Sequence, residues 1–205
     1  NQSAGRVDVA VRNCAESLQL DRKGGLEMAQ TAGAVVIGSG AFGGSVAFHL
    51  LQRGVRDVVV IDMHAIGSQT SARAAGNAAQ ARGHPLMTTI ARDAVDRFLR
   101  FADETGEQID VVRSGSLALS WTEAGATMLR SLHAVAAASG LGTELVDPAV
   151  AADLSPHLDP SGAAAILYTP DDVYLEPAQL PRAYAAVVER LGGRLVPDTA
   201  VTGVL

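Results

Sequence analysis

The sequence of 205 residues predicts an α/β fold, and two observations carry that prediction. Residues 35–37 and 58–61 are β-branched apolar runs of strand length, and residues 41–52 between them have the apolar spacing of a helix. Strand, helix and strand in this order favour a parallel sheet covered by helices. Residues 109–176 then alternate shorter β-rich runs with helical stretches, which predicts part of a second, mixed-sheet α+β domain.

Three glycines follow the first strand in the pattern G-x-G-x-x-G, and each has a mechanical role. Gly38 permits a tight turn, Gly40 lets a pyrophosphate approach the backbone, and Gly43 lets the helix pack closely on the strands. The first helical turn adds free N–H groups and the positive end of the helix dipole. Asp62 ends the second strand, where an acid accepts hydrogen bonds from a ribose hydroxyl pair. The segment therefore predicts a Rossmann-like dinucleotide-binding domain, with an ordinary glycine turn as the alternative.

The overall composition narrows the class of protein. Hydrophobic residues make up 48% of the chain, which is enough for a large core, and the net charge of −6 argues against general nucleic-acid binding. No run of 18 apolar residues predicts a membrane span. The single cysteine, Cys14, excludes an internal disulfide, and with no secretion-signal pattern it favours a cytoplasmic protein. Lys23 is the only lysine beside many Arg and Ala residues, which suggests a bacterial source.

The N-terminal residues differ from the rest of the chain. Residues 1–31 are polar and lack sustained periodicity, and Met28 stands just before the first strand. We expect residues 1–27 to be a leader or an arm outside the fold, with an ordered N-terminal arm as the alternative.

The elements that follow Asp62 are bounded by familiar start and stop signals. Pro85 precedes an amphipathic stretch, Thr122 is a candidate N-cap, and Gly140 and Gly192 are candidate helix ends. Gly115 marks a bulge or hairpin bend in a β-rich run. The predicted elements are a helix at 86–105, strand structure at 111–121, a helix at 123–139, a strand at 143–146, a helix at 148–154, a strand at 163–168, a turn at 169–172, a helix at 177–191, and strands at 194–197 and 200–205.

A loop rich in small and hydroxyl residues follows the ribose acid, at residues 67–80. Small side chains let backbone N–H groups reach an extended ligand, and Thr70 or Ser71 is placed to bond a phosphate while Arg73 supplies charge. A plain linker is the alternative for this loop.

Two of these segments together resemble a known family. Residues 35–44, Val-Val-Ile-Gly-Ser-Gly-Ala-Phe-Gly-Gly, and residues 67–76, Gly-Ser-Gln-Thr-Ser-Ala-Arg-Ala-Ala-Gly, are similar to the FAD-dependent amine oxidoreductases. That family includes D-amino-acid oxidase, glycine oxidase, sarcosine oxidase and dimethylglycine dehydrogenase. The resemblance implies FAD rather than NAD, since the second segment looks like the family's loop under the flavin. The family usually carries Glu where this chain has Asp62, and a shorter acid still reaches a ribose.

The resemblance continues through softer motifs in the same order as in the family. They are Gly115-Ser116-Leu117, Leu154-Ser-Pro156, Asp171-Asp172 and Tyr174-Leu-Glu-Pro177, and the last strand holds Val201, whose backbone the family pairs with adenine. Relatives continue for about as long again beyond Leu205, so the chain looks like an N-terminal portion. The implied segments are a leader or arm at 1–31, the first part of the FAD-binding domain at 32–108, part of the substrate domain at 109–176, and a return to the FAD-binding domain at 177–205.

The resemblance implies a site and an activity. The implied cofactor-binding residues are Gly38, Ser39, Gly40, Ala41, Phe42, Gly43, Asp62, Thr70, Ser71, Arg73, Ala75, Gly76, Asn77 and Val201. The implied cofactor is noncovalent FAD, because neither Cys14 nor His64 matches a covalent attachment site. The implied reaction oxidises a small amine or amino acid, with oxygen or another acceptor taking the electrons. No catalytic residue is assigned.

Several alternatives stay open on the residues themselves. Asp171 and Asp172 form a candidate acid–base pair, with an exposed turn as the simpler interpretation. Asn77 either bonds the flavin or occupies a loop with unusual backbone angles. The five histidines have no metal-ligand spacing, so no metal site is predicted. A nicotinamide-dependent dehydrogenase, a non-catalytic nucleotide-binding fragment, and one partner of a two-chain flavoenzyme are the competing functions.

Overall fold

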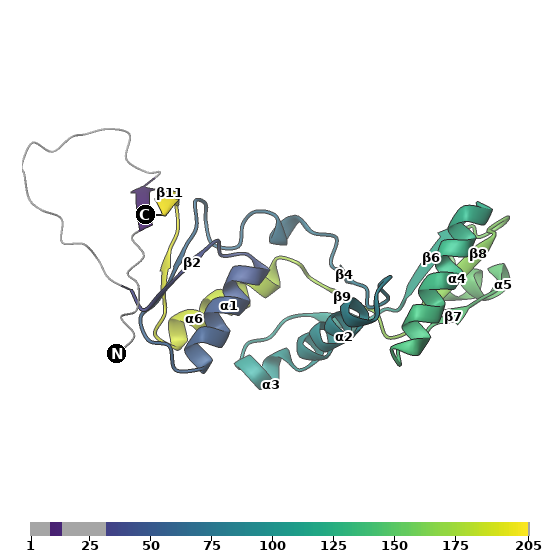
Figure 1. The fold of residues 1–205 in the computed structure, drawn as a ribbon, viewed down its shortest axis with the longest axis horizontal. Helices are drawn as coiled ribbons and strands as arrows, with labels where there is room; N and C mark the ends of the chain where they lie inside the picture. The colour runs from purple at the N-terminus through teal and green to yellow at the C-terminus, as the bar shows by residue number, and fades with distance from the viewer. Residues whose placement is uncertain (1–8, 14–31, 205) are drawn as a thin grey trace, which may run out of the picture. The chain divides into compact units, whose positions relative to one another are not determined.

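The computed structural model of the chain describes residues 9–13 and 32–204. The chain divides into two compact units, each of which is described by itself (Figure 1). Unit 1 contains the described residues up to Ala75, Thr105–Gln108, and the chain from Pro177 onward. Unit 2 contains Gly76–Glu104 and Ile109–Glu176.

Unit 1 is built on a parallel three-stranded sheet, as the α/β prediction requires. Its strand order is β10 (Arg194–Val196), β3 (Val58–Ile61), β2 (Ala34–Ile37). All four residues of β3 are buried, since this strand has a neighbour on each side. Helix α1 (Ala41–Gln52) connects β2 to β3 with the bounds that the sequence predicts.

Two helices lie side by side in unit 1 (Figure 1). Helix α6 (Gln179–Arg190) follows the second unit and leads into β10. The ring centre of Tyr184 on α6 lies 5.9 Å from the ring centre of Phe48 on α1. A Cβ on Gly44 would lie 2.7 Å from the Tyr184 Cβ, so the absence of a side chain at Gly44 permits this close packing. Packing against α6 therefore holds α1, and with it the N-terminus of α1, in place on the sheet.

A short antiparallel pair forms a separate two-stranded sheet in unit 1. Strand β1 (Val9–Asn13) runs beside β11 (Thr199–Val204), with Val11 opposite Val201. This pairing differs from the expectation that residues 1–31 take no part in the fold. The remainder of the expected leader, with Cys14, Lys23 and Met28, lies outside the described residues.

Among the described residues, unit 2 contains two three-stranded sheets beside its helices, and every strand pair in them is antiparallel, whereas the sequence predicts a mixed sheet in this part of the chain. One has the order β4 (Asn77–Ala78), β9 (Val173–Leu175), β5 (Val111–Arg113). The other has the order β6 (Ser116–Ser120), β8 (Ala165–Thr169), β7 (Glu144–Leu145).

The β-rich run 111–121 is interrupted where the bend was expected. Gly115, with a φ of +63°, separates β5 from β6, and the two strands enter different sheets instead of forming a hairpin with one another. Its amide donates to the carbonyl of Asp172, which fixes the change of direction.

The helices of unit 2 follow the predicted capping signals. Helix α4 (Glu123–Ala138) begins after Thr122, whose hydroxyl accepts from the amide of Gly125, and α5 (Pro148–Leu154) has the predicted bounds. The helix expected at 86–105 is two elements, α2 (Pro85–Leu99) and α3 (Phe101–Thr105). Helix α2 packs against α4, and for this reason residues 76–104 belong to unit 2, although the sequence placed them with the cofactor-binding domain.

Asp172 organises the centre of unit 2. Its side chain is only 1% exposed, and its carboxylate accepts from the amide of Gln80 at 2.8 Å and from the hydroxyl of Ser116 at 2.5 Å. Asp171 is exposed and pairs with Arg113 at 3.3 Å. The expectation of an exposed turn is therefore correct for Asp171 and wrong for Asp172, because Asp172 ties three separate segments of the unit together.

Candidate cofactor site

The glycine turn places a bare backbone at the start of α1. Gly40 is the N-cap residue, and a Cβ on it would lie 2.8 Å from the Ser71 hydroxyl. A Cβ on Gly43 would overlap the carbonyl oxygen of Gly38, so the turn and the first helical turn are in direct contact. The amides of Phe42 and Gly43 lie in the first turn, where a helix supplies no acceptor of its own. These donors face a position that suits an anion.

Asp62 follows β3 and lies beside the glycine turn. Its Oδ2 accepts from the Ser39 amide at 2.7 Å and from the Ser39 hydroxyl at 2.6 Å. Its Oδ1 accepts from the His64 amide at 2.9 Å. Partial burial opposes ionisation of Asp62, but the hydrogen bonds from Ser39 and His64 outweigh it and lower the pKa of this carboxyl group. The side chain is therefore a carboxylate near neutral pH.

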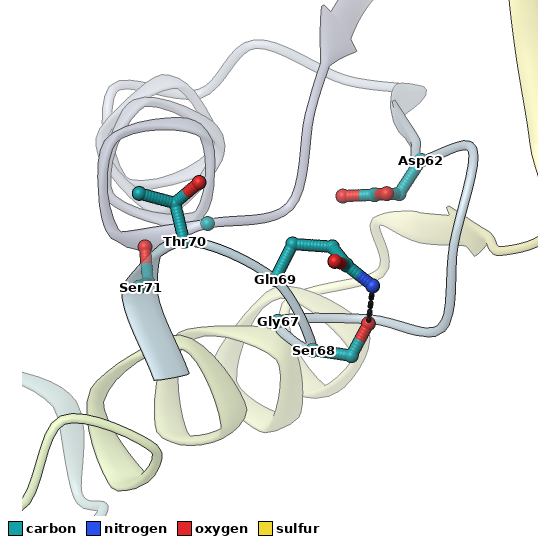
Figure 2. A pocket seen from close by; sticks show the side chains of 7 residues that line it. Asp62, Gly67, Ser68, Gln69, Thr70 and Ser71 are labelled. Atoms are coloured by element: carbon teal, nitrogen blue, oxygen red, sulfur yellow. Dashed lines mark hydrogen bonds between the residues drawn. The ribbon is translucent and has the colours of Figure 1, made fainter. Parts of the chain in front are cut away.

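The loop after Asp62 closes the site from a second direction. Ser71 begins a single 3-10 turn (Ser71–Arg73), and its hydroxyl accepts from the amide of Ala41 at 2.9 Å. The loop and the glycine turn enclose a pocket of about 190 Å³. Figure 2 shows the Asp62 carboxylate directed toward this loop. The lining residues are Gly40, Asp62, Gly67, Ser68, Gln69, Thr70 and Ser71.

These residues fit the nucleotide end of a dinucleotide. A phosphate needs close backbone approach and free amides, which Gly40 and the first turn of α1 supply. A ribose needs an acceptor at the end of the next strand, which Asp62 supplies from one wall of the pocket. Sequence reasoning named Thr70 and Ser71 but not Gly67, Ser68 or Gln69. The signal for these three was the run of small and polar residues at 67–80.

The remaining predicted residues are more dispersed. Phe42 is 92% exposed at the start of α1, and Arg73 is the last residue of the 3-10 turn. Val201 lies in β11 opposite Val11. Ala75 ends the first segment of unit 1.

Two further predicted residues belong to unit 2. Gly76 has a φ of +81°, and a Cβ on it would lie 2.6 Å from the Tyr174 ring, so glycine is required there. Asn77 is exposed and pairs with Tyr174 as part of β4.

Within residues 9–13 and 32–204, no cluster of three or more His, Cys, Asp or Glu side chains is placed to hold a metal ion. Among the helices of the same described ranges, none is long and apolar enough to cross a membrane.

The parallel sheet, the glycine turn and the acid after β3 define a Rossmann-like dinucleotide-binding fold. The family model "FAD dependent oxidoreductase" (DAO) matches residues 34–205, and the chain belongs to that family. Its members bind FAD, as the resemblance implied.

Individual relatives agree with this assignment. The chain is 33% identical over 171 residues to 4-methylaminobutanoate oxidase (formaldehyde-forming) of Paenarthrobacter nicotinovorans. The aligned segment covers 83% of this chain and 21% of that protein. The chain is 28% identical to mitochondrial dimethylglycine dehydrogenase of Mus musculus, over 86% of this chain and 20% of that protein. The crystal structure of L-proline dehydrogenase from P. horikoshii superposes with a TM-score of 0.78 at 25% identity, over 85% of this chain and 46% of that one.

The matches cover most of this chain but less than half of each relative. The chain spans about a fifth of the length of the curated relatives it matches, and a little under half of the solved structure. The match corresponds to an N-terminal portion, as the sequence indicated.

Proposed function

We propose that this chain is the FAD-binding portion of an oxidoreductase that oxidises the C–N bond of a small amine or amino acid. The observation that carries the proposal is the pocket between the glycine turn, Asp62 and the loop 67–71, within a chain of the FAD-dependent oxidoreductase family. The relatives named above carry amine and amino-acid substrates in their names, which supports this substrate class.

Each residue of the pocket has a role in binding. The amides of Phe42 and Gly43 donate to a phosphate, and Gly40 leaves room for it. Asp62 accepts from the adenosine ribose, and Ser71 keeps the start of α1 beside the loop through its bond to Ala41. We expect these contacts to hold the cofactor noncovalently.

The chemistry follows from the bound cofactor and the substrate class. Bound FAD would supply a hydride acceptor for the carbon that carries the nitrogen; the proposed products are an imine, hydrolysed by water to a carbonyl compound and an amine or ammonia, and reduced flavin, which oxygen or another acceptor would reoxidise. The chain's part in this reaction is to bind and orient the cofactor, since no acid–base group is assigned.

The test is a binding experiment on the purified chain. The chain is incubated with FAD, freed of excess cofactor and examined for flavin absorbance. Bound flavin that acid or heat releases from the protein supports noncovalent FAD. Retention of NAD or NADP with no affinity for FAD would instead favour a nicotinamide-dependent dehydrogenase.

A two-chain enzyme is the second candidate, and one observation favours it. Within the described residues, β2 has a neighbouring strand on one side alone, and Val35 and Ile37, which share one face of β2, are 38% and 55% exposed. Parallel sheets are ordinarily covered on both faces, so this face suits a covering segment, which a partner chain or a further part of this protein would supply. Co-purification with a second flavoenzyme chain, and turnover only in its presence, would support the partner.

A further inference from the structure

We infer that Ser39 is a positioning residue of the cofactor site, and that it limits Asp62 to one ribose hydroxyl. The inference rests on the proposed function and goes beyond it, because the sequence predicted that Asp62 accepts from a hydroxyl pair. It follows from the contacts of three residues: Ser39, Asp62 and Gly67.

The two carboxylate oxygens of Asp62 accept different numbers of hydrogen bonds within the protein. A carboxylate oxygen accepts about two hydrogen bonds. Oδ2 already accepts two, from the amide and from the hydroxyl of Ser39, at 2.7 and 2.6 Å. Oδ1 accepts one, from the His64 amide at 2.9 Å. One acceptor position on Oδ1 is left for a ligand.

Ser39 itself does not line the pocket. Its side chain is 2% exposed, and its hydroxyl donates to Asp62 while accepting from the Gly67 amide at 2.9 Å. Gly67 has a φ of +65°, and a Cβ there would lie 2.7 Å from the Pro181 Cβ, so the loop has little freedom to shift. Ser39 therefore connects the glycine turn, the ribose acid and the following loop through one buried hydroxyl group.

A consequence for the ligand follows from this arrangement. An adenosine ribose presents two hydroxyl groups, and only one of them has an acceptor on Asp62. The second hydroxyl finds its partner elsewhere, for example in water. The Ser39 hydroxyl thus determines which oxygen of Asp62 is presented and how many bonds it makes to the ribose.

The first experiment uses the full chain and three probes, ADP, 2′-deoxy-ADP and 3′-deoxy-ADP, in competition with FAD. Each affinity is measured for the wild-type protein and for Asp62→Ala. A hydrogen bond to a charged group corresponds to about a tenfold or larger change in affinity. In the wild-type protein, each missing ribose hydroxyl should weaken binding relative to ADP. We expect Asp62→Ala to remove this difference in affinity for one deoxy analogue and to leave it unchanged for the other. Loss of both differences would show a bidentate Asp62 and overturn the inference.

The second experiment addresses Ser39 directly. Ser39→Ala frees one acceptor position on Oδ2, so both hydroxyl groups become sensitive to Asp62 and the two deoxy analogues bind more nearly alike. The matched control is Ser68→Ala, which removes a hydroxyl group that lines the same pocket and accepts a hydrogen bond from the Gln69 side chain. An unchanged ratio between the analogues in Ser39→Ala would contradict the positioning role.

A third measurement separates this inference from the proposed function. The Asp62 carboxyl group is titrated by NMR without nucleotide, in the wild-type chain, Ser39→Ala and Ser68→Ala. We expect the pKa of Asp62 to rise in Ser39→Ala alone, while His64, the titratable neighbour that also acts on Asp62, is present in all three proteins. A rise in a chain that binds neither FAD nor ADP would defeat the proposed function but support the Ser39 contact. An Asp62 pKa that does not move in folded Ser39→Ala would defeat the Ser39 inference.

Discussion

The hydroxyl of Ser71 accepts a hydrogen bond from the amide of Ala41 at 2.9 Å, across 30 residues of sequence. Ala41 is the first residue of α1, so Ser71 satisfies one of the amides that a helix leaves open at its start. Gly40, the N-cap residue, has no side chain to do this. The loop that lines the cofactor pocket therefore also caps the helix that is placed to bind the phosphate.

Ser71→Ala tests this capping role. We expect a loss of about 0.5–2 kcal/mol in the free energy of unfolding, the range for losing an N-cap side chain. FAD affinity should fall as well, because the loop is no longer tied to the glycine turn. Denaturant unfolding and flavin titration measure the two effects. Thr70→Ala is the control for stability, since the Thr70 side chain makes no cap hydrogen bond, and equal losses in both variants would contradict the role.

Gly40→Ala tests the space for a phosphate. The backbone of Gly40, with φ −68° and ψ −172°, is open to alanine, so the change adds a methyl group without backbone strain. That methyl group would lie 2.8 Å from the Ser71 hydroxyl and displace it. We expect FAD affinity to fall by at least about tenfold, or about 1.4 kcal/mol.

The control for Gly40→Ala is Gly83→Ala, at a position where a Cβ would meet nothing within 4 Å. Flavin fluorescence titration compares the two variants with the wild-type chain. Equal FAD affinity in Gly40→Ala and the wild-type chain would show that the phosphate does not approach this residue.

Local patterns predicted much of this fold. The bounds of α1 and α5 and the cap at Thr122 follow from signals within a few residues, because capping and helical periodicity are short-range effects. The glycine turn and Asp62 were found for the same reason, since both lie within one strand–helix–strand unit.

Long-range pairing was less accessible from the sequence. Strand β9 (Val173–Leu175) was not predicted, because three residues carry too little periodicity to be recognised. The break between α2 and α3 at Arg100 has no Gly or Pro to announce it. The burial of Asp172 was missed because its partner Gln80 is 92 residues away.

Asp172→Asn tests the buried anchor of unit 2. In Asp172→Asn the new amide nitrogen cannot accept, so either the Gln80 backbone amide loses its acceptor or the Ser116 hydroxyl turns from donor to acceptor, and in both orientations the hydrogen bonds lose the charge of the carboxylate. We expect the unfolding free energy to fall by about 1.5–3 kcal/mol, the range for hydrogen bonds to a charged group.

Asp171→Asn is the matched control, one residue away. The ion pair of Asp171 with Arg113 is exposed, with side-chain exposures of 60% and 58%, so its loss should cost no more than about 1 kcal/mol. Thermal and urea unfolding measure both variants. A larger loss for Asp171→Asn than for Asp172→Asn would reverse the assigned roles.

The pH dependence of stability tests the carboxylate of Asp62. Its pKa is lowered from 3.8 in the folded chain, because the Ser39 and His64 hydrogen bonds favour the charged form over the opposing effect of burial. A group with a lowered folded pKa contributes stability above its unfolded pKa, and this contribution disappears as the pH falls through the folded value. The wild-type chain should therefore exceed Asp62→Asn in unfolding free energy at pH 6, and the difference should shrink below about pH 4. Urea unfolding of both proteins from pH 6 downward measures this difference, with Asp171→Asn as a carboxylate control. A difference that stays constant across the range would mean that Asp62 is not stabilised as a carboxylate by these bonds.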